Sequence, residues 1–222
     1  MRCSPPIGLL LVLALASTPA QAASRWTADA GVGDAANLQL PVLVTQDRQP
    51  DLEFRGHWET PAFEGAPYFA LRVGLADSSG AWALELVHHK IRLTNTTAEV
   101  QSFEVSHGYN LLVLERLRIR AWWHLGAGLG VVVAHPENRV RDLSLNESRG
   151  VFGLGYDLTG PAVVLLGGVR HPLGRGAHAF AELKISGASA RLPVAQGWSS
   201  VPNVAAHVTI GLGWSAPAAA AH

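Results

Sequence analysis

The most regular feature of this chain is a two-residue alternation of apolar side chains with polar or small ones. It is clearest near the C-terminus, where one parity of residues 203–214 carries Val204, Ala206, Val208, Ile210, Leu212 and Trp214. Similar alternation recurs in residues 121–134 and 177–189. A period of two is typical of β-strands whose two faces meet different surroundings. We therefore predict an all-β chain.

Alternation and turn-forming residues together predict eight strands. We place them at about residues 36–45, 67–76, 81–93, 106–115, 121–134, 159–170, 177–189 and 203–214. The connections alternate between tight turns, such as residues 77–80, and longer segments, such as residues 46–66 and 135–158. A secreted β-sandwich gives no reason for this sorting, whereas transmembrane barrels have short periplasmic turns and longer outer loops. The pattern thus favours an eight-stranded antiparallel up-and-down transmembrane β-barrel.

The N-terminal segment has the three parts of a secretory signal peptide. Arg2 precedes an apolar run over residues 7–16, and Ala20-Gln21-Ala22 forms a small-residue cleavage site. We therefore predict a signal peptide at 1–22, a periplasmic lead-in at 23–35, an outer-membrane barrel at 36–214 and a disordered tail at 215–222. Cys3 is the only cysteine and leaves with the signal, which excludes disulfide chemistry in the mature chain.

Composition agrees with an exported membrane barrel. The chain is 48% hydrophobic, yet after the signal it has no apolar run of the ~18 to 20 residues that a membrane helix needs. Its 17 basic and 17 acidic residues balance, so nothing points to a nucleic-acid partner. Tryptophans fall near the predicted periplasmic strand ends, where an aromatic girdle belongs: Trp82, Trp122, Trp123 and Trp214.

The interior of an eight-stranded barrel is just wide enough to be filled by side chains, so we do not expect an open pore. Inward parity collects Arg72, Glu85, Asn110, His124, Glu182, Lys184 and His207. We interpret these residues as a polar network that fills the lumen through ion pairs and hydrogen bonds. A proton path or a ligand site among them is the alternative.

Half of the ten histidines converge on the predicted outer rim. They are His57, His88, His89, His107 and His135, and the carboxylates near them are Glu59, Glu64, Glu137 and Asp157. Imidazole with carboxylate is a competent ligand set for a divalent metal; plain polar decoration of the rim is the alternative. Parity would point His88 and Lys90 toward lipid. Either a β-bulge near Val87 reverses them, or both stand above the hydrocarbon beside lipid headgroups.

Several short motifs occur in a fixed order between about Phe54 and Trp214. They are Trp58-Glu59 with Phe63-Glu64, Pro67-Tyr68 and Arg72; Leu84-Glu85 with His88 and Lys90; Gly108, Asn110 and Leu114; Gly126 to Val131 with His135 and Glu137; Tyr156 with Gly160-Pro161-Ala162; and Glu182 with Lys184. In order and spacing they resemble the lipid A oxidase-like outer-membrane β-barrels.

This resemblance implies an oxygen-dependent oxidation of the proximal glucosamine of lipid A to an aminogluconate, assisted by a divalent metal ion. It implies outer-membrane lipopolysaccharide as the partner. On this reading His88, Lys90 and Glu64 are the candidate catalytic residues, with Lys90 paired to a lipid phosphate. His88, His135 and Glu137 are the candidate metal ligands.

A second function class remains open at this point. A non-catalytic barrel could stabilise the membrane or bind a partner through residues 46–66 and 135–158. The sequence has no nucleophile elbow, no glycine-rich phosphate loop opening a helix and no haem-attachment motif. Serine hydrolysis by that fold, nucleotide chemistry and covalent haem are therefore disfavoured.

Overall fold

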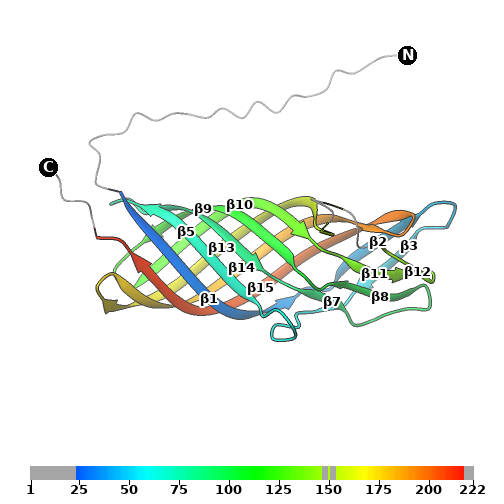
Figure 1. Cartoon of the computed structure of the whole chain (residues 1–222), viewed down its shortest axis with the longest axis horizontal. Coiled ribbons are helices and arrows are strands. Elements are labelled where there is room, and N and C mark those ends of the chain that lie inside the picture. Colours follow the sequence, from blue (N-terminus) through cyan, green and yellow to red (C-terminus); the bar gives the residue numbers. More distant parts are fainter. Residues whose placement is uncertain (1–23, 147–149, 151–153, 218–222) are drawn as a thin grey trace, which may run out of the picture.

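A computed structural model of the chain describes residues 24–146, 150 and 154–217. Its main feature is a closed antiparallel barrel in which each strand pairs with its neighbours along the chain and the last pairs with the first (Figure 1). The barrel strands are β1 (Arg25–Asn37), β5 (Phe69–Ala76), β6 (Ala81–His88), β9 (Tyr109–Ile119), β10 (Trp123–Ala134), β13 (Asp157–Gly174), β14 (Ala177–Val194) and β15 (Gly197–Ser215). The predicted eight-stranded barrel is confirmed. None of the described residues forms a helix long and apolar enough to cross a bilayer.

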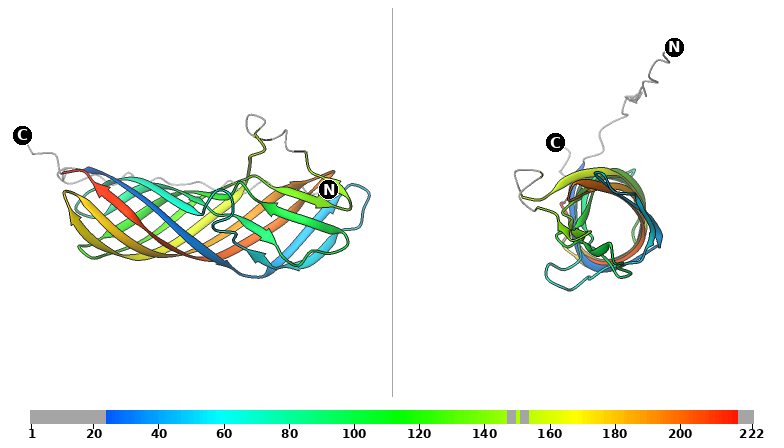
Figure 2. Two further views of the ribbon diagram at one scale, coloured as in Figure 1. Left: turned by 60° about the horizontal axis from the view of Figure 1, so that its bottom comes forward. Right: turned by 90° about the vertical axis from the view of Figure 1, so that its right-hand side faces the viewer.

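One end of the barrel continues into an extension built from shorter strands (Figure 2). There β2 (Leu40–Gln46) pairs with the start of β15 and with β3 (Leu52–Gly56). A separate five-stranded sheet has the order β12-β11-β8-β7-β4. Its strands are β4 (Trp58–Glu59), β7 (Ile91–Leu93), β8 (Val100–Val105), β11 (Glu137–Val140) and β12 (Leu143–Ser144).

The opposite end of the barrel carries the tight turns, and the barrel sheet also begins and finishes there, with the start of β1 and the end of β15. Connections between β5 and β6, β9 and β10, and β13 and β14 are short there, and the first residues of β1 lie beside the last residues of β15 (Figure 1). Short turns mark the periplasmic side of transmembrane barrels. We therefore call this end periplasmic and the extension extracellular.

The wall of the periplasmic half has the face pattern of a membrane barrel. On β15 the outward side chains Val208, Ile210 and Leu212 are 57 to 63% exposed, while the intervening Thr209 is 2% exposed. Exposed leucines and valines continue this belt around the other strands. Of the tryptophans predicted for a girdle at its periplasmic edge, Trp82, Trp122 and Trp214 are exposed and Trp123 is half-buried, and the exposed Trp26, which was not predicted, joins them. Such a belt is stable only beside hydrocarbon.

The extension has the inverse pattern, with a dry apolar interior and a charged surface. Its buried side chains include Val42, Val44, Trp58, Ile91, Phe103, Val140, Leu192, Val194 and Val201. Trp58 and Phe103 pack edge to face, with ring centroids 5.7 Å apart. The extension is thus packed like a water-soluble β-protein on top of a membrane barrel, rather than being a set of loops.

A substitution that leaves a cavity in this core is expected to lower the stability of the extension measurably. Leu192 is fully buried, so Leu192→Ala is expected to lower the free energy of unfolding of the extension by about 2 to 3 kcal/mol. Urea unfolding followed by tryptophan fluorescence measures it, because Trp58 lies in the same core. Leu143→Ala, at a position 39% exposed on β12, is the matched control with an expected loss below about 0.5 kcal/mol. Equal losses in the two variants would contradict a packed extracellular core.

The first barrel strand differs from the sequence prediction. Residues 25–37 form β1, which pairs with β15 and β5, where a periplasmic lead-in at 23–35 was expected. The predicted first strand at 36–45 falls instead on the end of β1 and on β2 in the extension. Strand β1 is rich in alanine and glycine, so its alternation has little hydrophobic contrast. The predicted signal peptide and most of the predicted tail lie outside the described residues.

The predicted strand at 81–93 is interrupted. Strand β6 ends at His88, and after His89 and Lys90 the chain resumes as β7 in the second sheet. The register of β6 shows no shift at Val87 against either neighbour. A β-bulge at Val87 is therefore wrong, and the polar residues lie where the chain changes from one sheet to the other.

Candidate functional site

A network of charged side chains fills the membrane half of the lumen. Arg72 lies at its centre and donates hydrogen bonds to Glu115 (2.8 Å), Glu85 (2.8 Å) and Glu182 (2.9 Å). Lys184 forms ion pairs with Glu85 and, at 3.3 Å, with Glu182. Each of these side chains is at most 4% exposed. The cross-section at this level is thus occupied by paired charges.

Further polar groups join this network on both sides. Toward the periplasm, Asp29 lies 3.5 Å from Arg72 and 3.0 Å from His178, and His124 lies 2.8 Å from Glu182. Toward the extension, His207 contacts the Tyr68 hydroxyl (3.0 Å) and the Ser186 hydroxyl (2.7 Å). The lumen therefore holds a continuous polar core below the apolar core of the extension.

Asn110 does not belong to the lumen, which corrects the sequence analysis. On β9 the exposed Leu112 and Leu114 share the parity of Asn110, whereas Glu115 has the inward parity and is fully buried. The Asn110 side-chain oxygen Oδ1 instead accepts a hydrogen bond from His88 Nδ1 at 2.8 Å on the outer side of the wall. Sequence reasoning missed Glu115 because it assigned β9 the opposite face; the exposed leucines were the signal for the correct one.

A second polar cluster lies at the extracellular rim. His107 follows β8, His135 follows β10, and Glu137 begins β11. Ligand atoms of these three residues all lie within 4.8 Å of one another. Glu137 is 3.1 Å from His107 and 3.9 Å from His135, and it also accepts a hydrogen bond from Ser106. Among described residues this is the group whose donors could share a metal ion, and we refer to it as the rim triad.

The rim triad sits outside the barrel wall and not in the lumen. Along β10 the outward leucines Leu125 and Leu129 are more than half exposed, and His135 continues their parity just above the belt. His107 is 62% exposed. The Tyr156 ring packs edge-on against His135 with ring centroids 5.0 Å apart, so one side of His135 is covered. The open side of the triad therefore faces the level of lipid headgroups.

The rim triad has the donor chemistry of a divalent metal site. Two imidazoles and a carboxylate suit zinc, iron, copper or nickel, and three protein ligands leave positions open for a substrate. Burial acts to raise the pKa of Glu137, but hydrogen bonds from Ser106 and His107 outweigh it and the pKa is lowered. The carboxylate is thus held in the charged form that a metal requires.

Glu64 and Lys90 lie beside the triad in a pocket of about 180 Å³ that His107 also lines. The Glu64 carboxylate forms an ion pair with Arg92 at 2.7 Å, and Lys90 donates a hydrogen bond to the Glu64 backbone carbonyl. Burial lowers the pKa of the Lys90 ammonium, and the Glu64 carboxylate opposes this shift. Glu104 also faces the pocket.

His88 is the predicted ligand that the structure does not place in the rim triad. Its ring stacks on Phe69 with centroids 4.8 Å apart, and it is 7% exposed. The structure brings His135 and Glu137 together as predicted partners, with His107 as the third member. His107 was visible in the sequence only as one of five rim histidines.

The Arg92–Glu64 pair makes a testable electrostatic prediction. The hydrogen bond from Arg92, and then its charge, lower the pKa of Glu64. The substitution Arg92→Gln is therefore expected to raise the Glu64 pKa toward the ordinary carboxyl value, measured by NMR titration of the ¹³C-labelled side chain. Arg191→Gln removes an arginine that stacks on Trp198 instead, and it should leave Glu64 unchanged. A Glu64 pKa that stays low without Arg92 would show that another group lowers it.

Together the belt and the rim define a class: an eight-stranded transmembrane β-barrel with a candidate metal centre on its extracellular lip. Solved structures with a similar fold are outer-membrane proteins. AlkL, solved by solid-state NMR in DMPC bilayers, is 12% identical, with 96% of this chain and 100% of that chain covered and a TM-score of 0.47. Neisserial surface protein A is 8% identical, with coverages of 86% and 96% and a TM-score of 0.42. OprG from Pseudomonas aeruginosa is 13% identical, with coverages of 86% and 93% and a TM-score of 0.38.

At these identities the likeness concerns the barrel alone and not a ligand or an activity. No family model matches the chain, and no curated protein matches it. The resemblance to lipid A oxidase-like barrels therefore stays a prediction.

Proposed function

We propose that this chain is an outer-membrane enzyme that oxidises the glucosamine headgroup of lipid A at the outer leaflet, with a divalent metal ion held by the rim triad. The observation that carries the proposal is the position of the triad. His107, His135 and Glu137 combine metal-binding donors with an outward orientation directly above the lipid-facing belt. A lipid headgroup reaches this position without leaving the bilayer.

The neighbouring pocket supplies groups suited to a phosphorylated sugar. Lys90 uses one hydrogen bond on the Glu64 carbonyl, so its ammonium retains donors for a phosphate oxygen. Arg92 is paired with Glu59, Glu64 and Glu104 and so holds carboxylates at the pocket wall, where Glu104 adds an acceptor for sugar hydroxyls. These residues would orient the headgroup beside the triad, and holding the reacting groups in the correct orientation raises the reaction rate.

The proposed reaction balances with oxygen as the oxidant. The C1 hydroxyl carbon of the proximal glucosamine loses two electrons and two protons, and O₂ accepts them and becomes hydrogen peroxide. Hydrolysis of the resulting lactone gives the aminogluconate. A bound divalent metal ion supplies Lewis-acid and redox chemistry for such a step. The substrate must carry a free C1 hydroxyl.

Mass spectrometry of lipid A tests the proposal. Cells that carry the gene are expected to accumulate, under aerobic growth, a lipid A species with one additional oxygen atom, and this species should be missing from the deletion strain and from cells grown without oxygen. Identical lipid A spectra with and without the gene would reject the oxidase and favour a non-catalytic barrel.

A further inference from the structure

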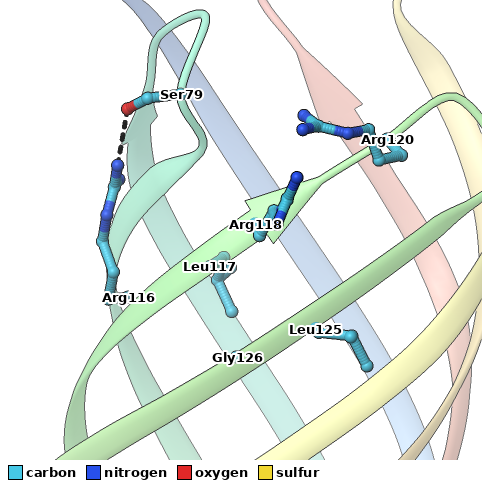
Figure 3. Close-up of a pocket in the computed structure, with 7 residues that line it drawn as sticks. All are labelled: Ser79, Arg116, Leu117, Arg118, Arg120, Leu125 and Gly126. Atoms are coloured by element: carbon cyan, nitrogen blue, oxygen red, sulfur yellow. Dashed lines mark hydrogen bonds between the residues drawn. The ribbon is translucent and has the colours of Figure 1, made fainter.

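The outer wall at the periplasmic end carries a row of arginines that the proposed function does not use. Arg116 and Arg118 are the outward residues at the end of β9, and Arg120 follows in the turn (Figure 3). Leu125 on β10 faces Arg118 in the register of the sheet, and Arg116 faces the small Ala127. The result is a shallow depression with cations at one end and apolar wall at the other.

None of these three arginines has a direct ion-pair partner within residues 24–146, 150 and 154–217. The carboxylate near Arg116 is Asp77, which accepts hydrogen bonds from Ser79 and Gly80 in its own turn. Asp77 interacts with Arg116 only through its charge and through the Ser79 hydroxyl.

The Arg116 guanidinium is held by two contacts and keeps one N–H group, at Nη1, without an acceptor among the described residues. It lies 5.6 Å from the centre of the Trp82 ring and donates a 2.6 Å hydrogen bond from Nη2 to the Ser79 hydroxyl. Its Nη1 is buried and has no hydrogen-bond partner among the described residues. A buried guanidinium N–H without an acceptor is costly, and an anionic oxygen at this position would satisfy it.

The level of the row in the membrane identifies the anion. Trp82 and Trp122 mark the periplasmic headgroup region, and Leu125 and Leu129 lie 54% and 72% exposed in the hydrocarbon next to the arginines. A phosphate placed here carries its acyl chains directly onto those leucines. We propose that Arg116, Arg118 and Arg120 form a binding site for an anionic phospholipid of the periplasmic leaflet, with its phosphodiester on the guanidinium groups and an acyl chain along Leu125.

Native mass spectrometry of the folded barrel tests this site. The wild-type protein is released from detergent with equal amounts of phosphatidylglycerol and phosphatidylethanolamine, and it is expected to retain phosphatidylglycerol preferentially. The double variant R116Q/R118Q should lose this preference by about fivefold for each arginine removed. The matched control is R25Q/R175Q, which removes two charges from the same end, one at the start of β1 and one in the turn between β13 and β14. Neither residue lines the depression, so this variant should keep the preference.

Folding is checked for every variant by the heat-dependent mobility shift of barrels in SDS gels. A wild type without preference for phosphatidylglycerol would overturn the proposal. So would equal losses in the two double variants, because the effect would then come from net charge. Displacement of the lipid by inorganic phosphate or by glycerophosphoglycerol at equal concentration would also overturn it, since the acyl chain would then contribute nothing.

Discussion

Replacing Arg72 with leucine is expected to lower the free energy of unfolding of the barrel by about 3 to 5 kcal/mol. The substitution removes the one side chain that contacts Asp29, Glu85, Glu115 and Glu182. Among the described residues, Glu115 would then lose its ion-pair partner, and Glu85 would keep only Lys184, in a lumen from which water is largely excluded. Removing one partner of a buried ion pair costs far more than the pair itself contributes, because the remaining charge stays desolvated. Urea unfolding of the barrel in lipid vesicles, followed by tryptophan fluorescence, measures the loss.

The control for Arg72 is an arginine in a surface ion pair of similar geometry. Arg139 lies 2.9 Å from Asp142, and both side chains are more than half exposed. Arg139→Leu is expected to cost at most about 1 kcal/mol, since exposed pairs contribute little. If R72L does not fold, the double variant R72L/E115Q provides the test, because removing one uncompensated carboxylate should restore part of the stability. Equal unfolding midpoints for R72L and R139L would show that the lumen is hydrated and that its charges are not coupled.

The membrane half of the fold was predictable because each of its strands alternates between apolar residues that face lipid and polar or small residues that face the lumen. On β15 the sequence alternates strictly, and the structure exposes Val208, Ile210, Leu212 and Trp214 to lipid as predicted. Short turns at residues 77–80 also follow from local sequence. In both cases the information lies within a few consecutive residues.

Long-range pairing was harder to predict. Strand β1 has weak alternation of its own, and its place depends on the partners β15 and β5, which lie far away in the sequence. The apolar interior of the extension was missed for a related reason. Val42, Leu192 and Val201 are buried there because three separate segments meet above the membrane. Leu192 and Val201 have the lumen-facing parity of Lys184 and His207 on the same strands, so the sequence of each strand alone does not show that its outer part belongs to an apolar core.

In the candidate site, too, the residues fixed by local sequence were predictable and those fixed by long-range pairing were not. The sequence predicts that His135 and Glu137 lie at the extracellular rim, because they come directly after the predicted strand at 121–134. The choice of His107 over His88 depends on how the chain leaves β6 at His88 and enters the second sheet, which is a tertiary event. A one-residue error in facing also exchanged Asn110 for Glu115 in the lumen, as expected for a structure whose side chains alternate with period two.

Removing His135 is expected to weaken metal binding at the rim by at least about 100-fold, since even indirect partners of metal ligands cost 10- to 100-fold. The ring of His135 is one of three donors whose atoms lie within 4.8 Å of one another, so His135→Ala leaves only His107 and Glu137. Isothermal titration of the folded barrel with Zn²⁺ measures the affinity. The same variant should abolish formation of the oxygenated lipid A species in cells.

Two histidine variants make this result specific. His57→Ala removes an imidazole from the extension outside the triad and should leave Zn²⁺ affinity unchanged. His88→Ala separates the structural assignment from the sequence prediction: an effect as large as that of His135→Ala would make His88 the third ligand in place of His107.

The pH dependence of metal binding follows from the same three residues. Hydrogen bonds from Ser106 and His107 outweigh burial and lower the pKa of Glu137, so its carboxylate is already ionised in mildly acidic solution and stays so until the pH falls through that lowered pKa. Protons then compete with the metal only at the two imidazoles. Zn²⁺ affinity is therefore expected to fall as the pH is lowered, because each imidazole must lose its proton to bind the metal. The slope should reach two protons per metal in the wild type and one in the His135→Ala variant. An affinity independent of pH would mean that the imidazoles do not bind the metal, and the rim triad would then be a hydrogen-bonded cluster that ends the barrel wall.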